Sequence, residues 1–202
     1  MAVRLKTKWH RSKRSERNRK GSNAPKKLED LSSVIAINIW KLAKEAFLHM
    51  EKEGFRFRED EQAIGFISEF LIFQLHITDR MIYGLVAEDE RNAFINATAR
   101  LLTQSVVENQ VEILGSGDYE KTFTGLMNTR LADYAECSFE DNAPGYDFVR
   151  YLGQTVGGIM SASDDKWVVE QVIDIEAPAV IEKITRVVTD VLGLRQRQKG
   201  GE

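Results

Sequence analysis

The chain has 202 residues, of which 28 are basic, 31 are acidic and one is a cysteine. This length suits one domain, and a hydrophobic content of 43% is enough for a substantial core. The composition excludes collagen-like, mucin-like and wholly disordered chains. The single cysteine, Cys137, excludes an internal disulfide framework and a multi-cysteine zinc site.

The charge is divided unevenly along the chain. Residues 1–27 contain eleven Lys or Arg and one acid, which gives a charge of +10, whereas residues 28–202 contain 17 bases and 30 acids, which gives −13. Because the first segment repels itself and is poor in apolar residues, we expect it to be disordered when alone. The sequence thus predicts a basic flexible tail at 1–27, a helical bundle domain at 28–194 and a polar C-terminal tail at 195–202.

The basic tail predicts a polyanion as its partner. A concentrated positive segment attracts nucleic acid, anionic lipid or an acidic protein surface, because binding releases counterions. A tryptophan in the basic run could stack on a base or lie at a lipid interface. The alternatives are a solubilising tail without a specific ligand, or one that folds onto the acidic body of its own or a neighbouring protomer in a homo-oligomer. The predicted polyanion-binding residues are Arg4, Lys6, Lys8, Trp9, Arg11, Lys13, Arg14, Arg17, Arg19 and Lys20.

The body is expected to be all-α. The chain has three prolines, and 118 residues without one separate Pro25 from Pro144, which favours long helices. Apolar residues recur at helical spacing, and strand-like alternation is scarce. Short loops favour antiparallel neighbours, so we predict an up-and-down bundle of five or six helices. No apolar run approaches the roughly 18 residues that span a membrane, and we expect a cytoplasmic protein.

Glycine, proline and capping residues mark the predicted helix boundaries. Gly54 and Gly193 end the first and last helical regions, and Asp118 is a candidate N-cap. Pro144 marks a turn, and Pro178 should break or kink the last helix because it lacks a backbone donor. In chain order the predicted helices cover residues 28–53, 61–86, 89–114, 119–139, 146–160 and 165–192.

The second helix is the most informative segment. Glu69, His76 and Arg80 fall in one narrow stripe, with Asp79 at its edge. Large apolar residues lie beside them, which a purely solvent-facing stripe would rarely carry. We therefore expect this helix to be enclosed on most sides, and its polar residues need partners. Arg130, on the apolar face of the fourth helix, is a candidate partner for Glu69.

The first helix offers further polar partners. Glu45 and His49 share one of its stripes, and an antiparallel arrangement would place them level with Glu69. The same arrangement would place His76 near Asn38 and Lys41. Histidines and carboxylates on facing helices form the metal sites of helical bundles, so a single transition metal in a mononuclear site is one prediction. A di-iron site is not expected because Glu-x-x-His is missing. The candidate metal ligands are His49, Glu69, His76, Asp79 and Glu45.

The remaining features favour structural roles. Gly153 and Gly157 form a small face that would let another helix approach closely, and Cys137 is expected to be a buried thiol. We expect solvated faces at the acids of the fourth helix and of the last helical region, namely Asp133, Glu136, Glu140, Glu170, Asp174 and Glu176.

Three functions remain open from the sequence. The first is a non-catalytic interaction or assembly protein whose basic tail tethers it to a polyanion. The second is a metal-binding or redox bundle at the ligands named above. The third is an enzyme that uses His76 as an acid–base group in a bundle pocket, with its other catalytic residues unknown. A hydrogen-bond network without any ligand would account for the same residues.

Overall fold

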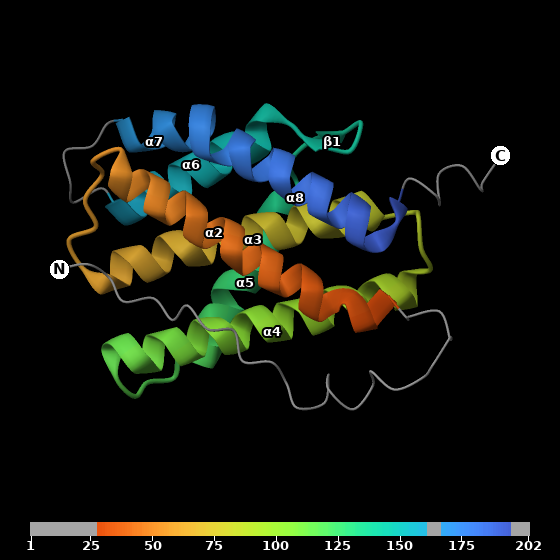
Figure 1. The fold of residues 1–202 in the computed structure, drawn as a ribbon, viewed down its shortest axis with the longest axis horizontal. Helices are drawn as coiled ribbons and strands as arrows, with labels where there is room; N and C mark the ends of the chain where they lie inside the picture. Colours follow the sequence, from red (N-terminus) through yellow and green to blue (C-terminus); the bar gives the residue numbers. More distant parts are fainter. Residues whose placement is uncertain (1–27, 161–166, 195–202) are drawn as a thin grey trace.

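A computed structural model describes residues 28–160 and 167–194, which form an all-α helical bundle (Figure 1). In chain order it contains a 3₁₀ turn (Leu28–Leu31), α2 (Ser32–Lys52), α3 (Asp60–Ile82), α4 (Glu88–Leu114), α5 (Tyr119–Ala135), a hairpin of β1 (Phe139–Glu140) and β2 (Ala143–Pro144), α6 (Tyr146–Met160), α7 (Trp167–Gln171), a π-helical turn (Val172–Glu176) and α8 (Ala177–Leu192). The prediction of an all-α bundle is confirmed.

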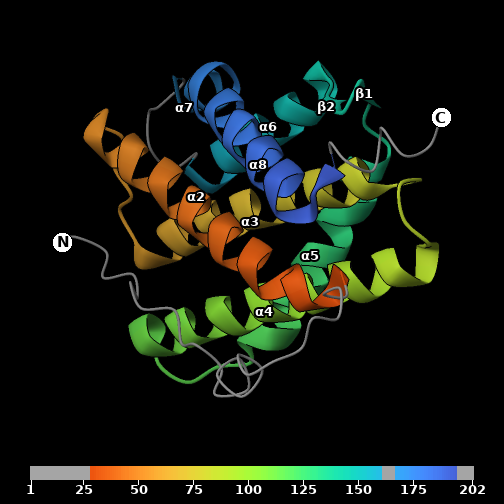
Figure 2. The ribbon, with the colours of Figure 1, turned by 45° about the vertical axis from the view of Figure 1, so that its right-hand side comes forward.

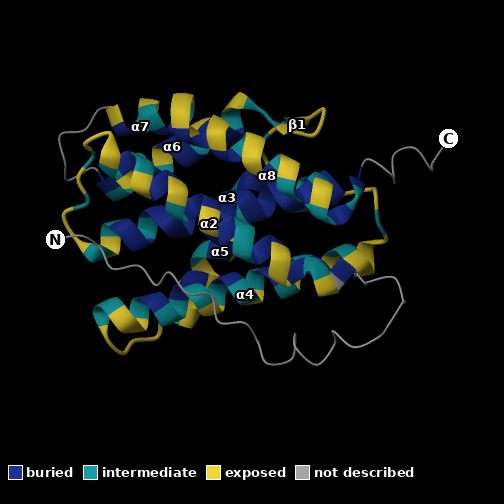
Figure 3. Cartoon of the chain, viewed as in Figure 1, coloured by how far each residue is buried: buried dark blue, intermediate teal, exposed yellow. Residues whose placement is uncertain are grey.

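Helix α3 forms the centre of the bundle. Of its 23 residues, 17 are buried, and α2, α4, α5, α6 and α8 all pack against it. Figure 3 shows it as an almost continuous dark blue ribbon between the outer helices. Its rings at Phe66, Phe70 and Phe73 are fully buried. The expectation that the second helix is enclosed on most sides is therefore confirmed.

The outer helices bury one stripe each, as amphipathic helices do. In α2 the apolar side chains of one stripe, Ile35, Ile39, Leu42, Ala46 and Met50, are all buried. Helices α4 and α5 bury fewer side chains and form one side of the bundle, with α7 and α8 on the other side (Figures 1 and 2). Among the described helices, none is long and apolar enough to cross a membrane.

Two helices end earlier than predicted because turns replace their last residues. Helix α3 stops at Ile82, and Gly84 follows in a left-handed conformation with φ of 74°. Helix α5 stops at Ala135 because the β1–β2 hairpin begins at Phe139. The two residues at the tip of that hairpin, Asp141 and Asn142, have φ of 51° and 60°. Two consecutive positive φ values are typical of a type I′ turn, which suits the twist of a short hairpin.

The last helical region continues through Pro178, with α7, a π turn and α8 following one another directly. A π-helical turn covers Val172–Glu176, and α8 then starts with Pro178 in its first turn. In a π turn each carbonyl pairs with the N–H five residues ahead rather than four. This shift removes the need for the N–H that proline lacks. The predicted start near residue 165 lies outside the described residues, whereas the predicted end at Gly193 is confirmed by its φ of 64°.

The glycine face of α6 brings α7 and the π turn close. A methyl group at Gly153 would lie 2.6 Å from Cγ1 of Ile173, and one at Gly157 would lie 2.6 Å from Cγ2 of Val169. Both distances are too short for real side chains. The predicted close approach of another helix is therefore confirmed. Gly158, on the same helix, has no neighbour within 4 Å of such a methyl group.

Candidate functional site

The buried carboxylate of Glu69 on α3 is held by Arg130 on α5. Glu69 is 1% exposed, and Nε of Arg130 donates to both of its carboxylate oxygens at 2.9 Å. The Nη2 group of Arg130 lies 2.9 Å from Oε1. This hydrogen bonding to Glu69 raises the pKa of Arg130 above its usual value. The predicted Glu69–Arg130 partnership is confirmed, and it gives the buried carboxylate of Glu69 a partner of opposite charge.

The same arginine extends the network to α6. Its Nη1 donates to the hydroxyl of Tyr151 at 3.1 Å, and that hydroxyl donates to the carboxylate of Asp133. Burial and the hydrogen bond to Asp133 raise the pKa of Tyr151 to about 12. Asp133 was expected to be on a solvated face, and its side chain is indeed 43% exposed, although the hydroxyl of Tyr151 reaches it from α6. We call Glu69, Arg130, Tyr151 and Asp133 the ionic network.

His76 lies next to the ionic network among aromatic rings. Its ring centroid is 5.9 Å from that of Tyr134 on α5 and 5.5 Å from that of Phe148 on α6. Burial, and in second place the charge of Arg80, lowers the pKa of His76 to about 4, so the ring is neutral at pH 7. Within the described residues, His76 Nε2 and the Tyr134 hydroxyl are both buried without a hydrogen-bond partner. The expected position near Asn38 and Lys41 is therefore wrong.

The cause of this error is the direction in which α3 meets α2. Gln74 Nε2 donates to the Ile39 carbonyl of α2 at 3.2 Å, so this face of α3 meets the first helix. His76 follows Gln74 by two residues and therefore lies roughly 200° around the helix. The Glu69–His76 stripe consequently faces α5 and α6.

The two α2 candidates face α8 and the π turn. His49 Nδ1 lies 2.6 Å from Oε1 of Glu176, a carboxylate only 3% exposed, and Gln171 Nε2 donates to the same oxygen at 2.9 Å. Lys183 Nζ donates to Glu45 Oε2 at 3.0 Å on the surface. Glu176 was expected to be on a solvated face. Instead, it anchors the π turn to α2.

Asp79 also has its own partner. Arg91 on α4 donates through Nη1 to both Asp79 oxygens, at 2.8 and 2.9 Å, and its guanidinium lies 5.1 Å from the centroid of the Tyr83 ring. Burial raises the pKa of Asp79, and the charge of Arg91 opposes that effect. This pair connects the end of α3 to the start of α4.

The five candidate metal ligands are thus dispersed over several contacts. Glu69 pairs with Arg130, Asp79 with Arg91, Glu45 with Lys183 and His49 with Glu176, while His76 packs among rings. Across residues 28–160 and 167–194, no group of three or more His, Cys, Asp or Glu side chains is arranged to hold a metal ion. The predicted mononuclear site has no support from this arrangement.

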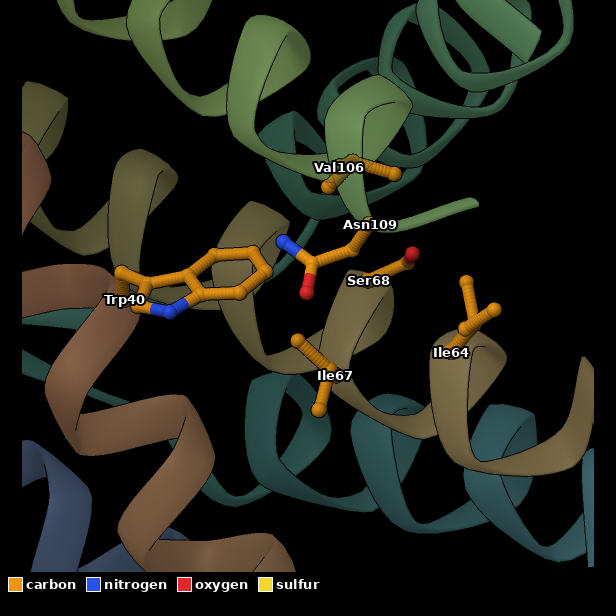
Figure 4. A pocket seen from close by; sticks show the side chains of 6 residues that line it. All are labelled: Trp40, Ile64, Ile67, Ser68, Val106 and Asn109. Atoms are coloured by element: carbon orange, nitrogen blue, oxygen red, sulfur yellow. The ribbon is translucent and has the colours of Figure 1, made fainter. Parts of the chain in front are cut away.

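Two hollows lie on either side of α4. The smaller one is about 10 Å³, room for one water molecule, and lies between α2, α3 and α4 (Figure 4). In Figure 4 the Trp40 indole and the Asn109 amide approach each other across it, with Ser68 beside Asn109 and Ile67 below. Neither hollow includes His76 in its lining, so the pocket-enzyme hypothesis has no support from them.

The larger hollow is a groove of about 480 Å³ between α4 and α5, which we call the α4–α5 groove. The small side chains of Ala99 and Thr103 on α4 are among the residues that line it. This groove was not predicted from the sequence, although the small residues Ala99 and Thr103 of α4 were a signal for it. The groove is lined by Ile95, Ala99, Thr103, Val107, Met127 and Leu131 together with polar side chains that include Asn96, Arg100, Gln104, Glu108, Glu120, Thr124 and Asn128.

Cys137 follows α5 and is only partly buried. Its Sγ lies 3.7 Å from the Asp133 carbonyl, and burial raises the pKa of its thiol. A raised pKa leaves little thiolate at pH 7, which fits a structural thiol rather than a nucleophile. The ten predicted polyanion-binding residues, from Arg4 to Lys20, lie outside the described residues.

Comparison of the chain with protein-family models, with curated proteins and with solved structures gives no match. A function for this chain must therefore be inferred from its own residues and their geometry.

Proposed function

We propose that this chain is a non-catalytic interaction protein of the cytoplasm, in which a helical bundle is tethered to a polyanion by its basic N-terminal tail. The observation that carries the proposal is the division of charge, with +10 in residues 1–27 and −13 in residues 28–202. Such a segment neutralises closely spaced phosphates and gains free energy from the released counterions. The acidic bundle repels the same polyanion, so the contact is confined to the tail.

The arrangement of the buried charges supports this proposal over the two alternatives. Glu69 and Arg130 satisfy each other, and Tyr151 and Asp133 complete the ionic network. Groups joined in this way stabilise the contact of α3, α5 and α6. His76 is neutral and enclosed by rings, where a substrate has no route to it through either hollow.

The test measures binding of the full chain to a single-stranded RNA and to vesicles that contain an anionic lipid. We expect RNA affinity to fall by roughly 10³ between 50 and 200 mM salt, as for several phosphate contacts. Replacing Lys13, Arg14 and Arg17 with glutamine should weaken binding and flatten the salt dependence. Binding as tight as that of the unmodified chain, by this variant or by a chain without residues 1–27, would contradict the proposal.

Substitutions of two tryptophans distinguish base stacking on a nucleic acid from binding to lipid and from charge attraction alone. Trp9→Ala should weaken RNA binding by about 1–3 kcal/mol if the ring stacks on a base. Trp167→Ala, at a side chain that is 72% exposed at the start of α7, is the matched control and should leave affinity unchanged. Binding to vesicles but not to RNA would assign the tail to a membrane surface.

A further inference from the structure

The α4–α5 groove combines an apolar floor with an acidic end. Its floor is formed by apolar side chains of both helices, including Ile95, Val107 and Met127. Glu108 and Glu120 line the end nearest the turn that joins the two helices. Residues 104–121, which surround that end, contain four acids and one base. This surface fits a segment that carries both apolar and basic side chains.

The basic tail begins beside the same helix. Leu28 is 2% exposed, and its 3₁₀ turn packs against α4, one of the two walls of the groove. The 27 residues before it could span up to about 90 Å when extended, whereas the 27 residues of α4 extend for about 40 Å. Every part of the groove is therefore within reach of the tail. A tethered segment also has an effective concentration in the millimolar range, so weak contacts suffice.

The start of the tail has the composition that this groove fits. Val3, Leu5 and Trp9 alternate with the basic residues at positions 4, 6 and 8. The apolar side chains can enter the floor, while the lysines meet Glu108 and Glu120. A second bundle docked in the groove would instead bring together two bodies of −13 charge each, which repel.

We propose that the α4–α5 groove is the intramolecular docking site of residues 1–20 of the chain's own tail. The bound tail has its apolar side chains in the groove and its basic side chains at the acidic end. One consequence rests on the proposed function: a polyanion and the groove compete for the same bases, so docking lowers the affinity of the chain for polyanions. The docking itself does not depend on any polyanion.

The test attaches a nitroxide to Ser12→Cys in a full-length Cys137→Ser chain and measures the broadening of backbone amide NMR signals. We expect the signals of Gln104, Thr124 and Asn128 to lose at least half their intensity relative to the reduced label. Signals of α7 and α8, on the other side of the bundle in Figures 1 and 2, should keep theirs. Uniform weak broadening over the whole bundle would overturn the proposal.

Charge reversal in the groove provides the matched comparison. Glu108→Lys with Glu120→Lys should abolish the selective broadening, whereas Glu170→Lys with Asp174→Lys should preserve it. Both double variants change the net charge by +4, and Glu170, Asp174 and Glu120 are all exposed. Broadening that is lost in both variants, or kept in both, would contradict docking at the groove. Circular dichroism of each variant confirms that the helices are intact.

Two further measurements distinguish intramolecular docking from docking by a second copy, and a failure of docking from a failure of the proposed function. Isotope-labelled chain mixed with unlabelled, spin-labelled chain should show no selective broadening, and broadening there would assign the groove to the tail of a second copy and overturn the intramolecular contact. If the groove variant loses broadening while neither form binds RNA or vesicles, the docking stands and the proposed function fails. If the chain binds a polyanion but the groove is never broadened, the function stands and the docking fails.

Discussion

The polar side chains on the two faces of helix α5 differ in their contacts with the rest of the bundle. On the inner face Arg130 is joined to the buried Glu69 and to Tyr151. On the outer face Thr124 and Asn128 are exposed at the rim of the α4–α5 groove, and Leu131, next to Arg130 in sequence, lines that groove. The charged group of the inner face has partners within the bundle, whereas the outer polar side chains are available to a further segment.

This difference shows why clustered ionisable residues are a poor guide to a binding site in a helical bundle. A charge that is buried must be paired, because desolvation costs several kcal/mol per ion. The strongest electrostatic contacts are therefore found where the bundle is closed. A groove with modest, mixed lining can carry recognition without any perturbed pKa.

The largest expected effect is a loss of stability when the ion pair on the inner face of α5 is broken. Glu69→Ala leaves Arg130 without its main partner, and removal of one member of a buried pair costs about 3–5 kcal/mol. The free energy of unfolding, measured by urea titration, should fall by that amount. Glu45→Ala is the matched control, since its pair with Lys183 is about half exposed, and it should cost less than about 1 kcal/mol.

A double variant distinguishes the cost of an unpaired buried charge from the cost of lost packing. Glu69→Leu with Arg130→Leu removes both charges, so it should be less destabilising than Glu69→Ala alone. A double variant at least as unstable as the single one would show that packing, rather than the unpaired charge, dominates at this site.

The second effect concerns the pH dependence of stability. The pKa of His76 is about 4 in the folded chain and about 6.5 when unfolded, so the unfolded state binds the proton more readily. Its contribution of about 3 kcal/mol is complete above pH 6.5 and is lost as the pH falls towards 4. Urea titrations at intervals across this range measure the slope. His76→Phe should flatten it between pH 6.5 and 4, and an unchanged slope would place the titrating group elsewhere.

The smallest effect is a pair of substitutions on α6. Gly153→Ala places a methyl group against Ile173 and 3.3 Å from the Val169 carbonyl, and we expect a loss of about 1–2 kcal/mol after the gain in helix propensity. Gly158→Ala meets open space and should stabilise the chain by about 0.5–1 kcal/mol. Thermal unfolding of both variants measures the difference, and equal midpoints would contradict the close contact of α6 with α7.

The sequence predicted the helices well because their signals are local. Apolar spacing fixed the buried stripe of α2, and Gly54 and Gly193 marked helix ends through their backbone freedom. Asp118 does precede α5, but its side chain makes no capping hydrogen bond. The π turn before Pro178 was not predictable from spacing, because it depends on hydrogen bonds that shift by one residue.

The candidate site was predicted less well. The residues that share a helix face were predicted correctly, but the helices that pack against those faces were not. The enclosure of Glu69 and its pairing with Arg130 follow from the need of a buried charge for a partner. Which helix covers His76 depends on the rotation of α3 in the bundle, and sequence spacing does not determine that rotation. The same uncertainty hid the contact of Glu176 with His49, 127 positions away in sequence.

The bidentate grip of Arg130 on Glu69 has a mechanical consequence for the outer surface. Any tilt of α5 that widened the space beside Leu131 would strain this hydrogen-bonded ion pair, in which the Glu69 side chain is only 2% exposed. One side of the recognition surface is thus a fixed wall, and an incoming segment must adapt its own shape to it. A preformed wall of this kind lowers the ordering cost on the receiving side, so more of the contact free energy is left for binding.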